Sequence, residues 1–225
     1  MFKAVVFDLD GTLIDSTPAI MDSFAHTFNE VGIAMPDYDT IYKTISMALE
    51  DQFKALCDED ADHLTQIFRK HYFSTCTQGT ELLPTVEESI KKLHATGVPL
   101  AIATSKSVKG SEIILEHLGM LSYFEFIIGG DTVKYHKPHS ECLELSMDRL
   151  GLDSDQIIFI GDTEFDTEAA YQAGVDCLTV ATGYASRDDL EKSTADRVFD
   201  QMDTLIDHLL TECLGNSSEP SAVKT

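Results

Sequence analysis

The sequence predicts an α/β protein in which helices cover both faces of a doubly wound parallel sheet and a helical domain is inserted. Short apolar runs rich in Val, Ile and Phe alternate along the chain with segments of helical periodicity. One long stretch, from about Thr17 to about Cys76, interrupts this alternation because it has helical periodicity and little that resembles a strand. These two observations define the fold class.

Five of the apolar runs have the composition of buried strands, and Gly, Asp or Pro bounds each of them. They are Lys3–Phe7, Pro99–Thr104, Phe124–Ile128, Gln156–Ile160 and Cys177–Ala181. Four helical segments lie between them, and each is followed closely by a glycine, which is a common C-terminal cap. These segments are Val86–Ala95, Val108–Leu118, Ser140–Leu150 and Glu164–Ala173. Strands that alternate with helices are expected to run parallel.

The inserted helical stretch begins with an apolar face formed by Ile20, Phe24, Phe28 and Val31, which Gly32 ends. We therefore expect an α/β core formed by residues 1–15 and 81–213 and a helical domain formed by residues 16–80. The last residues, 214–225, contain Asn, Ser, Pro and Gly, and we expect them to form a flexible tail.

The composition excludes several classes of partner. The 225 residues include 16 basic and 39 acidic ones, so the net charge of −23 disfavours binding to nucleic acid or to an anionic membrane surface. No apolar run approaches the length of a membrane span, and we expect a cytoplasmic protein. The five cysteines are widely spaced and odd in number, which indicates reduced thiols rather than a disulfide framework.

Two aspartates at the end of the first predicted strand would place two negative charges side by side. Asp8 and Asp10 follow the apolar run directly, and side chains two residues apart on an extended chain point the same way. Like charges held side by side are unfavourable unless a cation or a shared proton relieves them. A positive group is therefore expected beside them.

Polar residues follow the other predicted strands as well, and the carboxyl ends of parallel strands meet at one edge of the sheet. Carboxylates suit a hard cation such as Mg²⁺, while hydroxyls and lysines suit a phosphate. The sequence thus predicts a metal-assisted phosphoryl-transfer site at this edge. The residues that follow the strands are Thr104, Ser105, Lys106, Lys137, Asp162 and Asp166.

Four motifs carry a resemblance to a known family. They read "DLDGTL" at Asp8–Leu13, "ATSK" at Ala103–Lys106, "HKP" at His136–Pro138 and "GDTEFD" at Gly161–Asp166. In this order and spacing the chain resembles the haloacid dehalogenase-like (HAD) hydrolase superfamily, close to its phosphoglycolate phosphatase group. The resemblance extends from about Phe2 to Leu210 and implies a Rossmann-like core with an α-helical cap inserted after the first motif.

The resemblance also implies roles for the acidic residues. Asp8 would be the nucleophile that forms an aspartyl-phosphate, and Asp10 would protonate the leaving oxygen and then activate water. Mg²⁺ would be bound by the Asp8 carboxylate, the Asp10 carbonyl and Asp162, with Asp166 supporting it. An alternative for Asp166 is that it only caps the following helix.

The remaining motif residues would bind the phosphate. Gly11 and Thr12 would turn the backbone toward it, Thr104 would donate its hydroxyl with Ser105 nearby, and Lys137 would neutralise charge. Thr104 could also be only a good strand former, and Ser105 and Lys106 could have no role. The histidines beside Lys137 are given none.

These roles predict a Mg²⁺-dependent phosphatase acting on a small phosphorylated metabolite, with phosphoglycolate as the first choice of substrate on overall resemblance. We expect a monomer or a homodimer. A pyrophosphatase or nucleotidase stays open, because the cap determines the substrate in this group. Ser46 stands where relatives often have Gly, which leaves any particular substrate open.

Other activities of the superfamily are disfavoured by single residues. A dehalogenase typically lacks an acid at Asp10, and a sugar-phosphate mutase carries histidine where this chain has Ile20. The cap loop Thr44–Asp51 has no basic residue to hold a second phosphate. A phosphonate-cleaving enzyme would need a cap lysine such as Lys43 or Lys54, but the first motif suits a phosphatase better. A catalytically silent binding protein is disfavoured because both motif aspartates are present.

Overall fold

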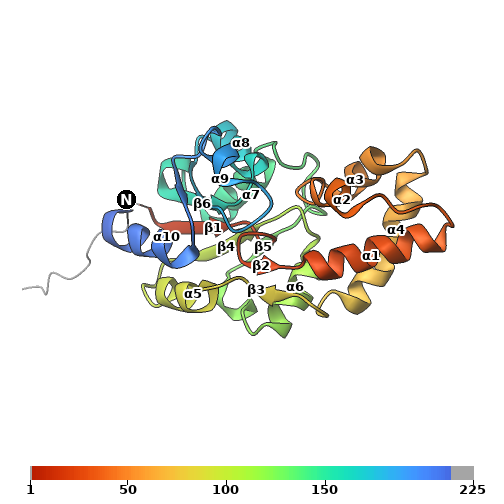
Figure 1. Ribbon diagram of the computed structural model, residues 1–225. Helices are drawn as coiled ribbons and strands as arrows, with labels where there is room; N and C mark the ends of the chain where they lie inside the picture. The colour runs from red at the N-terminus through yellow and green to blue at the C-terminus, as the bar shows by residue number, and fades with distance from the viewer. Residues whose placement is uncertain (1, 214–225) are drawn as a thin grey trace, which may run out of the picture.

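A six-stranded parallel sheet forms the centre of the molecule (Figure 1). The computed structural model describes residues 2–213. The strands run in the order β5-β4-β1-β6-β7-β8, so the first strand of the chain lies in the middle and crossovers occur to both sides. This arrangement is the doubly wound α/β fold that the sequence predicts. The strand bounds are β1 Ala4–Phe7, β4 Leu100–Ala103, β5 Ile127–Ile128, β6 Ile157–Gly161, β7 Asp176–Val180 and β8 Arg197–Phe199.

All five predicted strands are present in the six-stranded sheet, and the sixth strand of that sheet was not predicted. The run predicted as Phe124–Ile128 is a strand only at Ile127–Ile128. A 3₁₀ turn at Leu121–Tyr123 and a bend at Glu125 come before it. The missed strand, β8, has three residues at the edge of the sheet. A strand this short gives no period-2 pattern long enough to detect.

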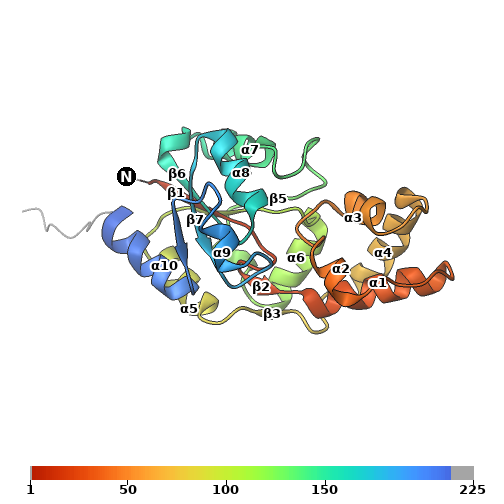
Figure 2. The same ribbon diagram turned by 45° about the horizontal axis from the view of Figure 1, so that its top comes forward.

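Helices cover both faces of the sheet (Figures 1 and 2). The two faces of β1 show this division: Val5 and Phe7 belong to the larger apolar cluster, which α5, α6 and α10 cover, and Ala4 and Val6 belong to a smaller cluster under α7 and α8. The helix bounds are α5 Val86–His94, α6 Val108–His117, α7 Glu141–Leu150, η2 Ser154–Gln156, α8 Glu164–Ala173, α9 Arg187–Leu190, α10 Met202–His208 and η3 Leu209–Cys213.

The four helices that follow the first motif pack together beside the sheet, and we call them the helical bundle (Figure 1). An aromatic cluster holds the bundle together, since the Phe24 ring lies 5.2 Å from that of Phe53 and 5.0 Å from that of Phe68. Such rings bury large apolar areas and prefer tilted or edge-to-face contacts. The bundle helices are α1 Thr17–Glu30, α2 Tyr38–Tyr42, α3 Leu49–Leu56 and α4 Ala61–Thr75.

A short antiparallel pair joins the two points where the chain enters and leaves the bundle. Strand β2 (Ile14–Asp15) pairs with β3 (Glu81–Leu82), with Ile14 opposite Leu82. Two residues on each side are too few for sequence patterns to predict.

Three further expectations concern the cysteines, the C-terminal tail and membrane-spanning helices. Cys57, Cys76, Cys142 and Cys177 are free thiols, while the side chain of Cys213 and the predicted tail 214–225 lie outside the described part. Between residues 2 and 213, the chain has no helix with the length and apolar character needed to cross a bilayer.

Candidate active site

The register of the central strands brings the motif residues to one edge of the sheet. Phe7 at the end of β1 lies beside Ile102 of β4 and Ile160 of β6. Asp8 and Asp162 therefore leave neighbouring strands at nearly the same level, which is where parallel sheets carry their sites.

Three buried carboxylates form the centre of this edge. Asp8, Asp162 and Asp166 each offer one oxygen, and these oxygens lie within 4.8 Å of one another. Burial, opposed by Lys137, raises the pKa of Asp8 to about 7, and burial together with Asp166 and Asp8 raises the pKa of Asp162 well above its ordinary value. Asp8 Oδ1 is buried, and its partner among the described residues is the ammonium of Lys137 at 3.0 Å. This donor set fits a divalent cation, which would offset the crowded negative charge.

Asp162 is held by a loop on each side of it. Thr12 Oγ1 donates to Asp162 Oδ1 at 2.8 Å, and the Tyr184 backbone N–H donates to Oδ2 at 2.8 Å. A Cβ atom would stand 2.3 Å from Asp162 Oδ2 at Gly11 and 1.9 Å at Gly183, so both positions require glycine.

This geometry places Gly11 and Thr12 against Asp162, and the role expected for their backbone at a phosphate stays a prediction. Sequence reasoning missed Gly183 and Tyr184 altogether. The one signal for them was a glycine shortly after the predicted strand that ends at Ala181.

Asp166 does two things at once. It forms a capping box with Thr163 at the start of α8, and its Oδ2 accepts from the Thr163 hydroxyl at 2.7 Å and from the backbone N–H of Asp162 at 3.2 Å. Its Oδ1 lies 2.6 Å from Lys137 Nζ. Asp166 therefore caps α8 but does not only cap it, and its support of a metal stays a prediction.

Lys137 stands between two of the acids. Its Nζ is 3.0 Å from Asp8 Oδ1 and 2.6 Å from Asp166 Oδ1, and the side chain is 4% exposed. Burial disfavours the charged form, but the two carboxylates outweigh it and raise the pKa of Lys137. The lysine stays protonated next to the predicted nucleophile.

Asp10 forms an ion pair with a different lysine, Lys106. Lys106 Nζ lies 3.2 Å from Asp10 Oδ2 and donates a 2.6 Å hydrogen bond to the Tyr72 hydroxyl on α4. Asp10 also accepts a short hydrogen bond from Ser16. Burial alone would lower the pKa of Lys106, but the Asp10 carboxylate outweighs burial and the pKa is raised. Sequence reasoning noted Lys106 at the sheet edge but missed Tyr72, because nothing in the sequence shows which face of α4 meets the core.

A small hollow of about 20 Å³ lies over the acids, and it brings together five of the predicted site residues. Ile45 and Ser46, in the bundle's loop between α2 and α3, also line this hollow, and Ser105 Oγ donates to the Ser46 carbonyl at 3.3 Å. The predicted residues that line it are Asp8, Asp10, Thr104, Ser105 and Lys137.

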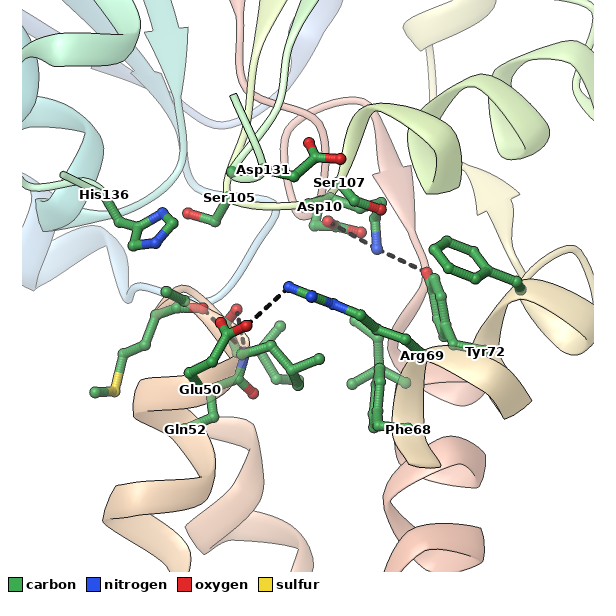
Figure 3. Close-up of a pocket in the computed structure, with 18 residues that line it drawn as sticks. Asp10, Glu50, Gln52, Phe68, Arg69, Tyr72, Ser105, Ser107, Asp131 and His136 are labelled. Atoms are coloured by element: carbon green, nitrogen blue, oxygen red, sulfur yellow. Dashed lines mark hydrogen bonds and ion pairs between the residues drawn. The ribbon is translucent and has the colours of Figure 1, made fainter. Parts of the chain in front are cut away.

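A larger pocket of about 270 Å³ adjoins the hollow, between the sheet edge and the bundle (Figure 3). Asp10 and Ser105 lie on its core side, and Phe68 and Tyr72 of α4 lie on its bundle side. The arrangement can hold a phosphoryl group at the acids and an organic group in the pocket.

Comparison with known proteins agrees with this geometry. A family model described as haloacid dehalogenase-like hydrolase matches residues 5–180. A phosphoglycolate phosphatase from Salmonella typhi is 30% identical over 230 residues, with 91% of each chain covered. One from Yersinia pseudotuberculosis is 32% identical over 190 residues, covering 81% of this chain and 82% of the relative.

Solved structures give the same result. A haloacid dehalogenase-like hydrolase from Streptococcus pneumoniae is 28% identical, with a TM-score of 0.84 over 92% of this chain and 98% of its own. A predicted phosphatase from Clostridium acetobutylicum is 27% identical, with a TM-score of 0.85 over 93% and 99%. The chain therefore belongs to the haloacid dehalogenase-like hydrolases. Its similarity to phosphoglycolate phosphatases confirms the resemblance inferred from the motifs, and it is an enzyme of the hydrolase class.

Proposed function

We propose that this chain is a Mg²⁺-dependent phosphatase that hydrolyses a small soluble phosphomonoester through an aspartyl-phosphate on Asp8. One observation carries the proposal: the buried Asp8 Oδ1 is paired with the Lys137 ammonium at 3.0 Å, and Asp8 lines a hollow that it shares with Asp10 and Lys137. A carboxylate oxygen is a nucleophile, and the neighbouring cation offsets the negative charge that gathers when a phosphate approaches it.

The first chemical step follows from the residues around the hollow. An Asp8 oxygen attacks phosphorus while Lys137, 3.0 Å from Asp8 Oδ1, neutralises charge on the phosphoryl oxygens. Thr104 donates its hydroxyl from the neighbouring strand end, and Ser105, whose hydroxyl donates to the Ser46 carbonyl, lies beside it. Asp10 lines both the hollow and the pocket, so it can protonate the oxygen that leaves toward the pocket.

The second step uses the same groups. Asp10, having lost its proton to the leaving oxygen, takes one from a water molecule that attacks the phosphorus of the aspartyl-phosphate. The bond between phosphorus and the Asp8 oxygen breaks, which frees the Asp8 carboxylate and releases inorganic phosphate. Asp8 and Asp162, with support from Asp166 and the Asp10 carbonyl, would hold Mg²⁺, which supplies charge neutralisation at the phosphoryl group when it is bound.

The substrate class follows from the relatives and the pocket. Relatives that are 30% and 32% identical to this chain are named phosphoglycolate phosphatases. A pocket of about 270 Å³ accommodates a small organic group. We propose a small phosphorylated metabolite, with phosphoglycolate as the first candidate. A pyrophosphatase or nucleotidase is the second.

We also propose that residues 1–15 and 81–213 form the catalytic core and that residues 16–80 form a cap. The bundle covers the hollow through Ile45 and Ser46, which supports a cap that excludes water in the first step and readmits it in the second. Hinges would lie near Asp15–Thr17 and Gly79–Leu82, on either side of the β2–β3 pair. Cytoplasmic location and a monomeric or homodimeric state stay predictions.

Phosphate release from a panel of small phosphate esters, pyrophosphate and nucleotides tests the function, with Mg²⁺ and with EDTA. We expect Mg²⁺-dependent release that Asp8→Asn abolishes while the fold is retained. A folded Asp8→Asn variant with near-normal turnover would contradict the nucleophile assignment.

A further inference from the structure

The larger pocket adjoins the hollow over the acids and has room for the organic part of a substrate. It shares Asp10, Ile45 and Ser105 with the small hollow over the acids, so the two spaces meet at the predicted proton donor. A phosphoryl group bound over Asp8 therefore directs its leaving group into the larger pocket. The charged residues of that pocket then decide which leaving groups are favoured.

Most charged groups that line the pocket are already engaged with the protein. Lys106 is bound to Asp10 and Tyr72. Asp131 Oδ1 accepts from the backbone N–H of Val108 at 2.9 Å. These groups are satisfied within the core and helix α4, so none of them needs a ligand.

Arg69 differs from these groups. It extends from α4 across the pocket, and its guanidinium lies between Glu50 and the core residues (Figure 3). Within the described part of the chain it donates one hydrogen bond, from Nη2 to Glu50 Oε1 at 2.9 Å. A guanidinium has five N–H donors in a planar fork, so most of its donors stay available to a ligand.

The apolar lining of the pocket would strengthen a contact between the Arg69 guanidinium and a ligand. The apolar side chains of Ile20, Leu49 and Phe68 line the same pocket. A ligand that fills it displaces water, and hydrogen bonds to charged groups gain strength as the local dielectric falls. The ion pair with Glu50 aims the guanidinium toward the pocket, although at 44% and 30% side-chain exposure the pair itself is weak.

We infer that Arg69 binds a carboxylate on the leaving-group side of the substrate, so that the preferred substrates are phosphate esters of small hydroxy acids. The inference rests on the proposed phosphatase function and narrows it. The fork of Arg69 matches a carboxylate in shape. Glu50 cancels part of the charge of Arg69, which favours a singly charged carboxylate over a second, doubly charged phosphate. Arg69 lies outside the cap loop Thr44–Asp51 that the sequence analysis considered.

The test compares two substrates that differ in one group. 2-Phosphoglycolate carries a carboxylate where 2-hydroxyethyl phosphate carries a neutral CH₂OH. We expect the wild-type enzyme to prefer phosphoglycolate in kcat/KM, and Arg69→Met to lower this preference about 10- to 100-fold, which is the range for a hydrogen bond to a charged group. Circular dichroism and thermal melting confirm that the variant is folded.

Matched variants separate this contact from general effects. Lys70→Met removes the neighbouring charge on α4, which is exposed and lies outside the pocket, and is expected to leave the preference unchanged. Glu50→Gln keeps an oxygen that can accept from Arg69 Nη2 but removes the negative charge that offsets Arg69, and we expect it to lower the KM for phosphoglycolate more than the KM for hydroxyethyl phosphate.

Two outcomes would overturn the inference, and a third would overturn the proposed function. Equal losses for both substrates in Arg69→Met would show that Arg69 does not select a carboxylate, and the phosphatase function would stand. A larger loss with ethylene glycol bisphosphate than with phosphoglycolate would assign Arg69 to a second phosphate. Failure of the wild-type enzyme to release phosphate from any ester with Mg²⁺ present would instead overturn the proposed function itself.

Discussion

Two buried lysines serve the same sheet edge, and they are held from different directions. Lys137 contacts Asp8 and Asp166, which both belong to the α/β core. Lys106 contacts Asp10 in the core and the hydroxyl of Tyr72 in the helical bundle. The surroundings of Lys137 are therefore complete without the bundle, whereas those of Lys106 depend on where the bundle lies.

This difference separates two tasks. A lysine fixed by core acids keeps a constant positive charge beside the predicted nucleophile, whatever the bundle does. A lysine shared between the predicted acid/base residue and the bundle can couple bundle position to Asp10. Removing each lysine should therefore have effects of different size and kind.

The largest effect is expected for Lys137→Met. The change leaves Asp8 and Asp166 buried without their cation, so the free energy of unfolding should fall by about 3–5 kcal/mol and phosphate release should fall to background. Urea unfolding and the phosphate assay measure both. The matched control is Lys134→Met in the same loop, an exposed side chain for which a change of about 0.5 kcal/mol or less is expected. A comparable loss in the control would contradict the account.

The second largest effect is expected on addition of Mg²⁺, which is predicted to bind at the acids beside Lys137. A ligand present at about 100 times its Kd stabilises the folded state by about 2.7 kcal/mol, which a thermal melt detects. We expect this stabilisation in the wild-type protein and in Lys106→Met, and its loss in Asp162→Asn. A stabilisation that survives in Asp162→Asn would place the metal elsewhere.

Lys106→Met should cost less than Lys137→Met. Asp10 keeps its hydrogen bond from Ser16, and its side chain is 15% exposed, so water can replace part of the lost interaction. We expect a loss of about 2 kcal/mol in the free energy of unfolding. Urea unfolding measures it, with the exposed Lys109→Met as control. A loss equal to that of Lys137→Met would remove the distinction between the two lysines.

Tyr72→Phe should have the smallest effect, because it removes one hydrogen bond and keeps the ring over Lys106. The expected loss is about 1 kcal/mol in the free energy of unfolding. If the hydroxyl couples the bundle to Asp10, kcat should fall while the Mg²⁺ stabilisation measured by melting stays constant. A fall in that stabilisation would show that the bundle contact reaches the acid cluster.

The core side of the site could be predicted from the sequence, and the bundle side could not. Asp8 and Asp162 follow apolar strands, and parallel topology alone brings such residues to one edge. The hollow over the acids contains five of the residues predicted for it, including Thr104 and Lys137. These placements depend on strand order, which the alternation of strands and helices determines.

Arg69 and Tyr72 were missed for a physical reason. Both lie on α4, and helical periodicity shows that the helix has an apolar face but not which part of it meets another domain. Gly183 was missed because it contributes no side chain to the site. It leaves room for the Asp162 carboxylate, and the sequence does not show that this room is needed. Such features depend on tertiary contacts between segments far apart in the sequence.

The central claim is that Asp8 is the nucleophile, and direct detection of its phosphoryl adduct tests it best. The enzyme is mixed with substrate and Mg²⁺, quenched in acid within the first turnover, digested and analysed by mass spectrometry. The account predicts phosphate on the peptide that contains Asp8, more of it in Asp10→Asn because hydrolysis of the adduct is slowed, and none in Asp8→Asn. Turnover of the substrate by an Asp8→Asn variant, with no phosphate on this peptide in the wild-type enzyme or in Asp10→Asn, would contradict it.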